Sequence, residues 1–102
     1  MESPITARAA LLQVLSTGEG YGLELIERVR TRSGGVVVLH QGSIYPTLRA
    51  LELEGLVDSY EADPMPERGG RPRRYYRLRP KGERVARTLR EGILGLFDYD
   101  CG

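Results

Sequence analysis

The sequence predicts an α+β fold that is mainly α, with a small sheet placed before the last helix. Apolar residues recur at the three- and four-residue spacing of helices in four segments of the chain. Two short segments, 56–61 and 74–79, alternate as β-strands do, and a stretch rich in Pro and Gly separates them. Most of the basic residues lie in and just after that stretch. Together these observations favour a helical body that carries one basic β-hairpin.

The composition is that of one compact domain. The chain has 102 residues, of which 40% are apolar and 28% charged. Its apolar runs are shorter than the roughly 20 residues that span a bilayer, and residues 1–17 lack the pattern of a signal peptide. A cytoplasmic protein without membrane contact is expected. Cys101 is the only cysteine, so a free thiol is expected and no intrachain disulfide.

The net charge of +1 hides a strong asymmetry along the chain. Residues 1–67 contain five basic and ten acidic side chains, residues 68–90 ten basic and one acidic, and residues 91–102 three acidic and no basic. Such a basic block predicts a polyanionic partner, because its field acts within a Debye length, roughly 10 Å, of that face. The alternative is a solvated arginine-rich surface.

The first predicted helix runs to about Leu15, with Ser3 as N-cap and Pro4 in the first helical position. Its residues are apolar around nearly the whole circumference, which requires cover on both sides. Since the core of so small a domain covers one side, a partner subunit is expected on the other, in contact with Ile5 and Leu12. The alternative is a central core helix whose alanines face solvent.

The second predicted helix would support the next one as the first member of a helix-turn-helix pair. It ends at Ser33-Gly34-Gly35, and its apolar stripe consists of Tyr21, Leu25, Ile26 and Val29. Residues 36–39 form a short β-branched run, which predicts one more strand, paired with the hairpin.

The sequence predicts neither a metal site nor a catalytic centre. His40 is the only histidine and no cysteine lies inside the chain, so metal ligands would have to be carboxylates alone. No nucleophile and base stand at a meaningful spacing. A role for His40 in positioning the following helix or contacting a phosphate is favoured, and no cofactor is expected.

Residues from about 43 to 54 are interpreted as the recognition helix of a DNA-binding protein. Ser43 is expected as N-cap, Pro46 in the first turn and Gly55 as the stop. One stripe points to the core and consists of Ile44, Leu48 and Leu51. Tyr45 and Arg49 point away from it, toward the phosphates and base edges of DNA. The alternative is a surface helix with ordinary polar residues.

Residues from about 57 to 79 are interpreted as a wing, a β-hairpin with a long basic tip. At the tip, Gly70-Arg71-Pro72 holds an arginine extended, a form that fits a narrow minor groove. Arg73 and Arg74 follow it and are also predicted to contact DNA. Tyr75 and Tyr76 must point to opposite faces of the strand, so one of them is expected in the core.

The last predicted helix follows Pro80 and carries an apolar stripe that its own domain leaves mostly uncovered. The stripe consists of Val85, Leu89, Ile93 and Leu96. Beside the all-apolar first helix, this stripe predicts a two-fold dimer surface.

The assembled order is that of a winged helix-turn-helix, with residues 1–80 as the DNA-binding domain and residues 81–102 as a C-terminal dimerisation helix and tail. In this order the sequence resembles the PadR family of bacterial transcriptional regulators. Motifs at the family's spacing carry the resemblance: Tyr21-Gly22, Gly42-Ser-Ile-Tyr-Pro-Thr-Leu48 with Leu51-Glu52 and Glu54-Gly-Leu56, and Gly70-Arg-Pro-Arg-Arg-Tyr-Tyr-Arg-Leu78 with Pro80-Lys-Gly82.

The resemblance implies a homodimeric repressor that binds double-stranded DNA at a two-fold symmetric operator and is released by an unknown signal. Recognition helices would enter adjacent major grooves, and wings would contact the flanking DNA. By position, the DNA contacts would come from Ser43, Tyr45, Pro46, Arg49, Arg71, Arg73 and Arg74. Two features depart from the family pattern. Leu53 stands where a polar residue is expected, and one C-terminal helix replaces the longer members' helical domain, which puts an effector pocket built from further helices in doubt.

Two other classes of function explain less of the sequence than a DNA-binding regulator does. A winged-helix module that binds protein would explain the surplus apolar helices but not the basic block at 68–90. An enzyme would explain neither feature.

Overall fold

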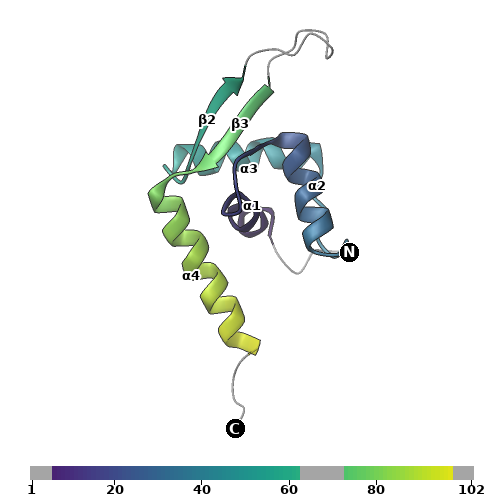
Figure 1. Ribbon diagram of the computed structural model, residues 1–102, viewed down its shortest axis with the longest axis vertical. Helices are drawn as coiled ribbons and strands as arrows, with labels where there is room; N and C mark the ends of the chain where they lie inside the picture. The colour runs from purple at the N-terminus through teal and green to yellow at the C-terminus, as the bar shows by residue number, and fades with distance from the viewer. Residues whose placement is uncertain (1–5, 63–72, 98–102) are drawn as a thin grey trace.

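The computed structural model describes residues 6–62 and 73–97. In chain order, the described elements are α1 (Ala7–Leu15), β1 (Gly20–Tyr21), α2 (Gly22–Arg32), α3 (Gln41–Leu53), β2 (Val57–Ala62), β3 (Arg73–Leu78) and α4 (Pro80–Phe97). Helices α1 to α3 form the body, strands β2 and β3 rise from one end of it, and α4 runs away in the opposite direction (Figure 1). The predicted mainly helical winged helix-turn-helix is confirmed.

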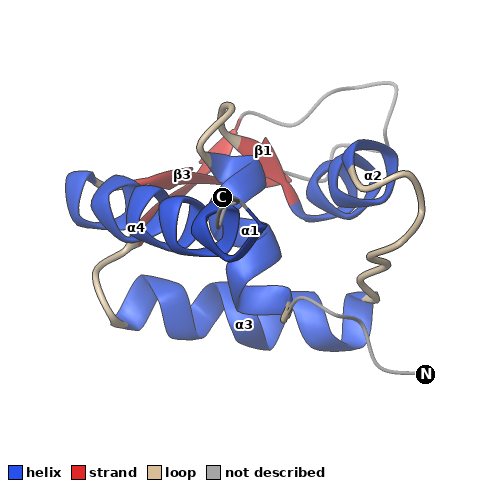
Figure 2. Ribbon diagram, turned by 90° about the horizontal axis from the view of Figure 1, so that it is seen from below, coloured by secondary structure: helices blue, strands red, loops and turns tan. Residues whose placement is uncertain are grey.

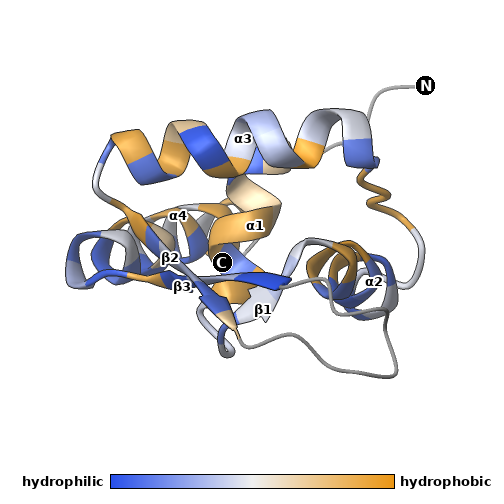
Figure 3. Cartoon of the chain, turned by 90° about the horizontal axis from the view of Figure 1, so that it is seen from above, coloured by the Kyte–Doolittle hydropathy of each residue, from blue (hydrophilic) through white to orange (hydrophobic). Residues whose placement is uncertain are grey.

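Helix α1 lies at the centre of the core. It is mostly apolar and stands between α3 and the sheet (Figure 3). Leu11 and Leu12 are fully buried there, together with Leu25 of α2 and Ile44 of α3. Leu12 has an exposed fraction of 0%, so its assignment to a dimer surface is wrong. Because helices and sheet of the same chain surround α1, the alternative of a central core helix describes it better.

The sheet is antiparallel with strand order β1-β3-β2. Its third strand is Gly20–Tyr21. The prediction of a strand at 36–39 is wrong. Residues 36–39 instead form an irregular connection, in which Val37 is buried and its amide donates a 3.0 Å hydrogen bond to the Ser33 hydroxyl. Val37 and Leu39 fill the core without pairing to a strand, whereas Val36 and Val38 are exposed. The two-residue strand β1 was missed because it is too short to show a periodicity.

The helix starts also differ from the predictions. Helix α1 begins at Ala7, and the Thr6 hydroxyl accepts a 3.1 Å hydrogen bond from the amide of Ala9. The predicted cap, Ser3 with Pro4, lies outside the described residues. Helix α3 begins at Gln41 after His40, so Ser43 lies inside the first turn and donates to the His40 carbonyl at 3.1 Å.

Pro46 lies beyond the first turn of α3, inside the helix. A proline there removes one backbone donor, the one that would bond to the carbonyl of Gly42. Both residues lie on the exposed side of α3.

Two interactions fix the far end of α3 to the rest of the body. The Arg8 guanidinium of α1 donates to both carboxylate oxygens of Glu54, at 2.6 and 2.7 Å. Lys81 of α4 donates to the Glu54 carbonyl at 3.3 Å. The hydrogen bonds from Arg8 hold the pKa of the Glu54 carboxyl below its usual value. Figure 2 shows α3 along one side of the molecule, with α1 and α4 above it.

No helix within the described ranges is long and apolar enough to cross a membrane.

Candidate nucleic-acid interface

Helix α3 presents the predicted outward face. Ile44, Leu48 and Leu51 are fully buried, as their stripe predicts. The four residues assigned to DNA contacts are exposed: Ser43, Tyr45, Pro46 and Arg49. The face is therefore built by the 3.6-residue period of one helix, whose opposite side is anchored in the core.

A hollow of about 590 Å³ joins this face to the wing strand. Tyr45 and Arg49 line it from α3, and Arg74 lines it from β3. The remaining lining residues are Glu52, Leu53 and Tyr76. The hollow brings the recognition helix and one wing arginine onto a common surface. Arg71, the arginine at the predicted tip, lies outside the described residues.

The two arginines of this hollow differ in their partners. Arg74 donates to the Ser59 hydroxyl at 2.9 Å and pairs with Glu61 at 3.3 Å, and both partners lie on β2. Ser59 in turn donates to Glu52 of α3 at 2.7 Å. Arg49 forms no ion pair with any other residue in the described ranges. Arg49 is thus available to an external anion, whereas Arg74 already links the wing to α3.

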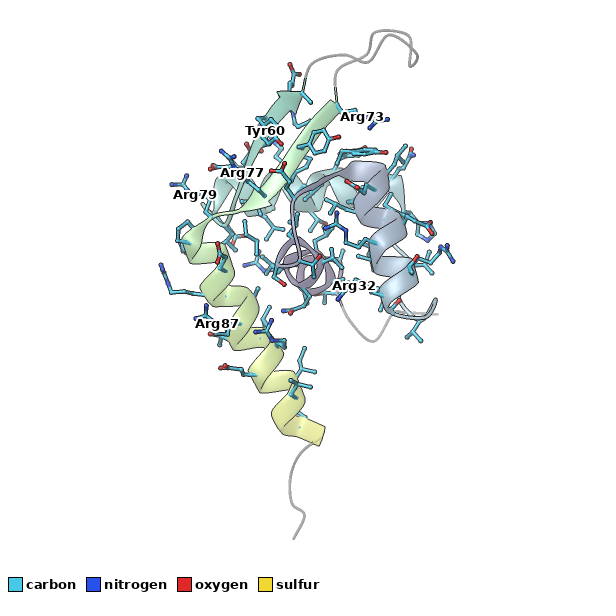
Figure 4. The ribbon with its side chains drawn as sticks, viewed as in Figure 1. Arg32, Tyr60, Arg73, Arg77, Arg79 and Arg87 are labelled. Carbon is cyan, nitrogen blue, oxygen red and sulfur yellow. The ribbon has the colours of Figure 1, made fainter. Side chains whose placement is uncertain are left out.

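Arg73 takes the opposite face of β3 from Arg74, as neighbouring residues of a strand must. Its guanidinium lies 4.2 Å from the centre of the Tyr21 ring, an arrangement that favours cation–π attraction. One of its terminal nitrogens, Nη2, is buried without a hydrogen-bond partner among the described residues. Figure 4 shows Arg73 beside the start of α2. Two of the predicted DNA-contacting arginines therefore point to different sides of one strand.

A row of three tyrosines crosses that same face of the sheet. Tyr75 stacks on Tyr60 with ring centres 5.7 Å apart and meets Tyr21 edge-on at 5.5 Å. The Tyr60 hydroxyl donates to Glu19 at 2.5 Å, and this bond raises its pKa above the usual value. Tyr76 lies on the other face in the core, where burial raises its pKa. The predicted split of Tyr75 and Tyr76 is confirmed, while the roles of Tyr21 and Tyr60 were missed because they depend on strand register.

The six residues predicted at the dimer surface differ in their burial. Val85 and Leu89 are half-buried and pack against the chain's own core. Ile93 is half-buried, whereas Leu96 is exposed. Ile5 lies outside the described residues. The remaining member, Leu12, belongs to the core.

Within residues 6–62 and 73–97, no group of three or more His, Cys, Asp and Glu side chains stands together as metal ligands would.

Leu53, the predicted departure from the family pattern, has an exposed fraction of 76% and borders the hollow. It places an apolar side chain beside the basic and acidic groups of the interface.

A helix-turn-helix whose second helix is exposed, with a β-hairpin beside it, defines the winged-helix class of DNA-binding regulators. The model of the Transcriptional regulator PadR-like family matches residues 11–88, and the chain belongs to this family. It is therefore a transcriptional regulator and not an enzyme.

Several solved structures resemble this chain. A transcriptional regulator from Clostridium thermocellum has 26% sequence identity and a TM-score of 0.71, and the match covers 83% of this chain and 79% of that one. A PadR family transcription regulator from Clostridium difficile has 26% identity and a TM-score of 0.69, over 84% of each chain. The circadian clock associated protein Pex from Anabaena has 29% identity and a TM-score of 0.66, over 92% of this chain and 85% of that one. No curated protein sequence matches the chain.

Proposed function

We propose that the protein binds a specific double-stranded DNA operator as a homodimer and represses transcription there. The observation that carries the proposal is the shared hollow, in which Tyr45 and Arg49 of the recognition helix stand with Arg74 of the wing. A recognition helix and a wing on one surface can reach a major groove and the flanking backbone together.

Arg49 is the residue of this surface best suited to read a base. It is exposed on α3, and a free guanidinium can donate two hydrogen bonds to the O6 and N7 atoms of guanine. Ser43 and Tyr45 bring hydroxyls to the same face, where they suit phosphate oxygens. Glu52 and Glu61 offset part of the positive charge, so the basic residues that follow residue 67 supply most of the attraction to DNA.

The homodimer is supported by the exposed apolar end of α4. Leu94 and Leu96 are exposed, and an apolar hollow of about 380 Å³ lies beside Ile93. Ala10, Val14, Val29 and Val37 also line that hollow. A second copy would cover Leu94, Leu96 and this hollow and would place two recognition helices on one duplex, which matches a two-fold symmetric operator. Repression, and release by a signal or effector yet to be identified, follow from the family resemblance.

Selection of bound duplexes from a random pool tests the proposal, because a two-fold symmetric consensus requires both specificity and dimeric binding. On the selected duplex, we expect Arg49→Ala to weaken binding by about 1–3 kcal/mol and to relax the preference at one position. Arg71→Ala should weaken binding and reduce the slope of log K against log salt concentration by about one. Fluorescence anisotropy at several salt concentrations measures both effects.

Arg30→Ala is the matched control. Arg30 is an exposed arginine of α2 that pairs with Glu27 and lies outside the hollow, so its loss should leave the affinity unchanged. Unchanged affinity of Arg49→Ala and Arg71→Ala alike would favour the alternative, a winged-helix module that binds protein.

A further inference from the structure

Gly22 is the point at which α2 meets the recognition helix. It is the first residue of α2, it is buried, and the side chain of Tyr45 lies against its Cα. A methyl group at Gly22 would overlap the Tyr45 hydroxyl oxygen and stand 2.7 Å from Cζ and 2.8 Å from Cε1. The place of the Tyr45 ring therefore depends on the absence of a side chain at position 22.

The backbone at Gly22 does not itself require glycine. Its φ is not positive, in contrast to Gly18, Gly34 and Gly35, and alanine is a better helix former. The three atoms nearest to such a methyl group all belong to the end of the Tyr45 side chain. That end can swing away by rotation about the side-chain torsions, so alanine at position 22 would move the ring and leave both helices folded.

Tyr45 belongs to the surface that the proposed function uses. It is 45% exposed and lines the hollow with Arg49 and Arg74. The hydroxyl end of its side chain thus lies on Gly22, while another part of the side chain is exposed at the proposed DNA interface. A change at Gly22 would reach that interface without touching DNA.

We infer that Gly22 is a positioning residue for DNA binding, which holds the Tyr45 ring in its place on the recognition face by leaving room for it. The inference rests on the proposed function, because Tyr45 must contact the operator. The neighbouring residue, Tyr21, packs edge-on against Tyr75 of the wing strand. The segment that begins α2 is therefore in contact with both proposed DNA-binding elements.

A double-mutant cycle on the selected duplex tests the inference. We expect Gly22→Ala to lose about tenfold in affinity while its thermal unfolding temperature stays at or above that of the wild type. Tyr45→Ala should lose about tenfold or more, and Gly22→Ala combined with Tyr45→Ala should match Tyr45→Ala within about twofold. Leu23→Ala, a change at the next and exposed position of α2, is the control and should bind as the wild type does. In the absence of DNA, NMR of ring-labelled tyrosine should show a shifted Tyr45 signal in Gly22→Ala.

Several results would overturn the inference. One is a Gly22→Ala protein that binds like the wild type, and another is a loss that persists in the Tyr45→Ala background. If Gly22→Ala does not fold, the combined variant must fold, and its failure to do so would also refute the inference. A wild-type protein that binds no duplex from the pool would instead refute the proposed function, and the inference with it.

Discussion

The two halves of α4 form one continuous helix, but the first half packs against the body of the protein and the second half is exposed. In the first half, Ala86 is fully buried and its carbonyl accepts a 2.8 Å hydrogen bond from Gln13 of α1. In the second half, Leu94 and Leu96 have exposed fractions of 58% and 72%. Both halves carry apolar residues at helical spacing, so the sequence pattern alone predicts the same burial for both.

Two glycines of α4, Gly82 and Gly92, also differ in how closely other atoms surround them. A methyl group at Gly82 would overlap the carbonyl oxygen of Leu56 and stand 3.0 Å from its carbonyl carbon. At Gly92, by contrast, no atom of the residues that the structure describes lies within 4 Å of the place of such a methyl group, apart from the neighbouring residues and backbone of the same helix. The first half of α4 is thus fitted against the backbone of its own chain. The second half has space that a second copy can fill.

The largest effect should come from Gly82→Ala. The methyl group would meet backbone atoms of Leu56, which cannot rotate away. The carbonyl of Leu56 also accepts a 2.9 Å hydrogen bond from the backbone amide of Arg79. We expect the free energy of unfolding to fall by about 3 kcal/mol or more. Urea denaturation measures it, and a stability equal to that of the wild type would show that the two halves do not differ in this way.

The second effect is on assembly. Leu96→Asp places a charge in the proposed dimer surface, and we expect a monomer, because a buried charge without a partner opposes association. The stability of each folded chain should change by less than about 0.5 kcal/mol, since Leu96 is exposed in the single chain. Analytical ultracentrifugation gives the mass. Leu53→Asp, a change at an exposed leucine of α3, is the control and should leave a dimer, and a dimer in both variants would contradict the assignment of the second half of α4.

The smallest effect should come from Gly92→Ala. Alanine in the interior of a helix is favoured over glycine by up to about 1 kcal/mol, and the new methyl group would come within 4 Å of no described residue outside the backbone and chain neighbours of its own helix. We expect this gain in the Leu96→Asp background, where association does not contribute to the measured stability. Urea denaturation of the two variants side by side checks it, and a loss of stability would mean that the region around Gly92 is closely packed within the single chain.

Much of the fold could be predicted because each helix has its own apolar period. The stripe of Ile44, Leu48 and Leu51 identified α3 and its buried side, and the alternation around Tyr75 and Tyr76 identified β3. The motifs of the recognition helix and wing led to the family that the sequence comparison then established. These features are local, so neighbouring residues determine them.

The candidate site was only partly predictable. The sequence placed Arg73 and Arg74 together on the wing, but strand register sends Arg74 to the recognition helix and Arg73 to Tyr21. It also did not show that Ser59 and Glu61 would bind Arg74, or that Ser59 would in turn donate to Glu52. These partners are distant in sequence, and no periodicity relates one element to another.

The sequence was enough to locate the four helices and the two strands of the hairpin, to show which side of α3 is buried, and to show where the basic charge is concentrated. The tertiary structure alone decided that Gly20–Tyr21 completes the sheet, that α1 is enclosed by its own chain, and that Gly22 receives the Tyr45 ring. The physical reason is the range of the interactions. Helical period and strand alternation act between near neighbours, whereas burial, register and close packing depend on residues that meet only when the chain has folded.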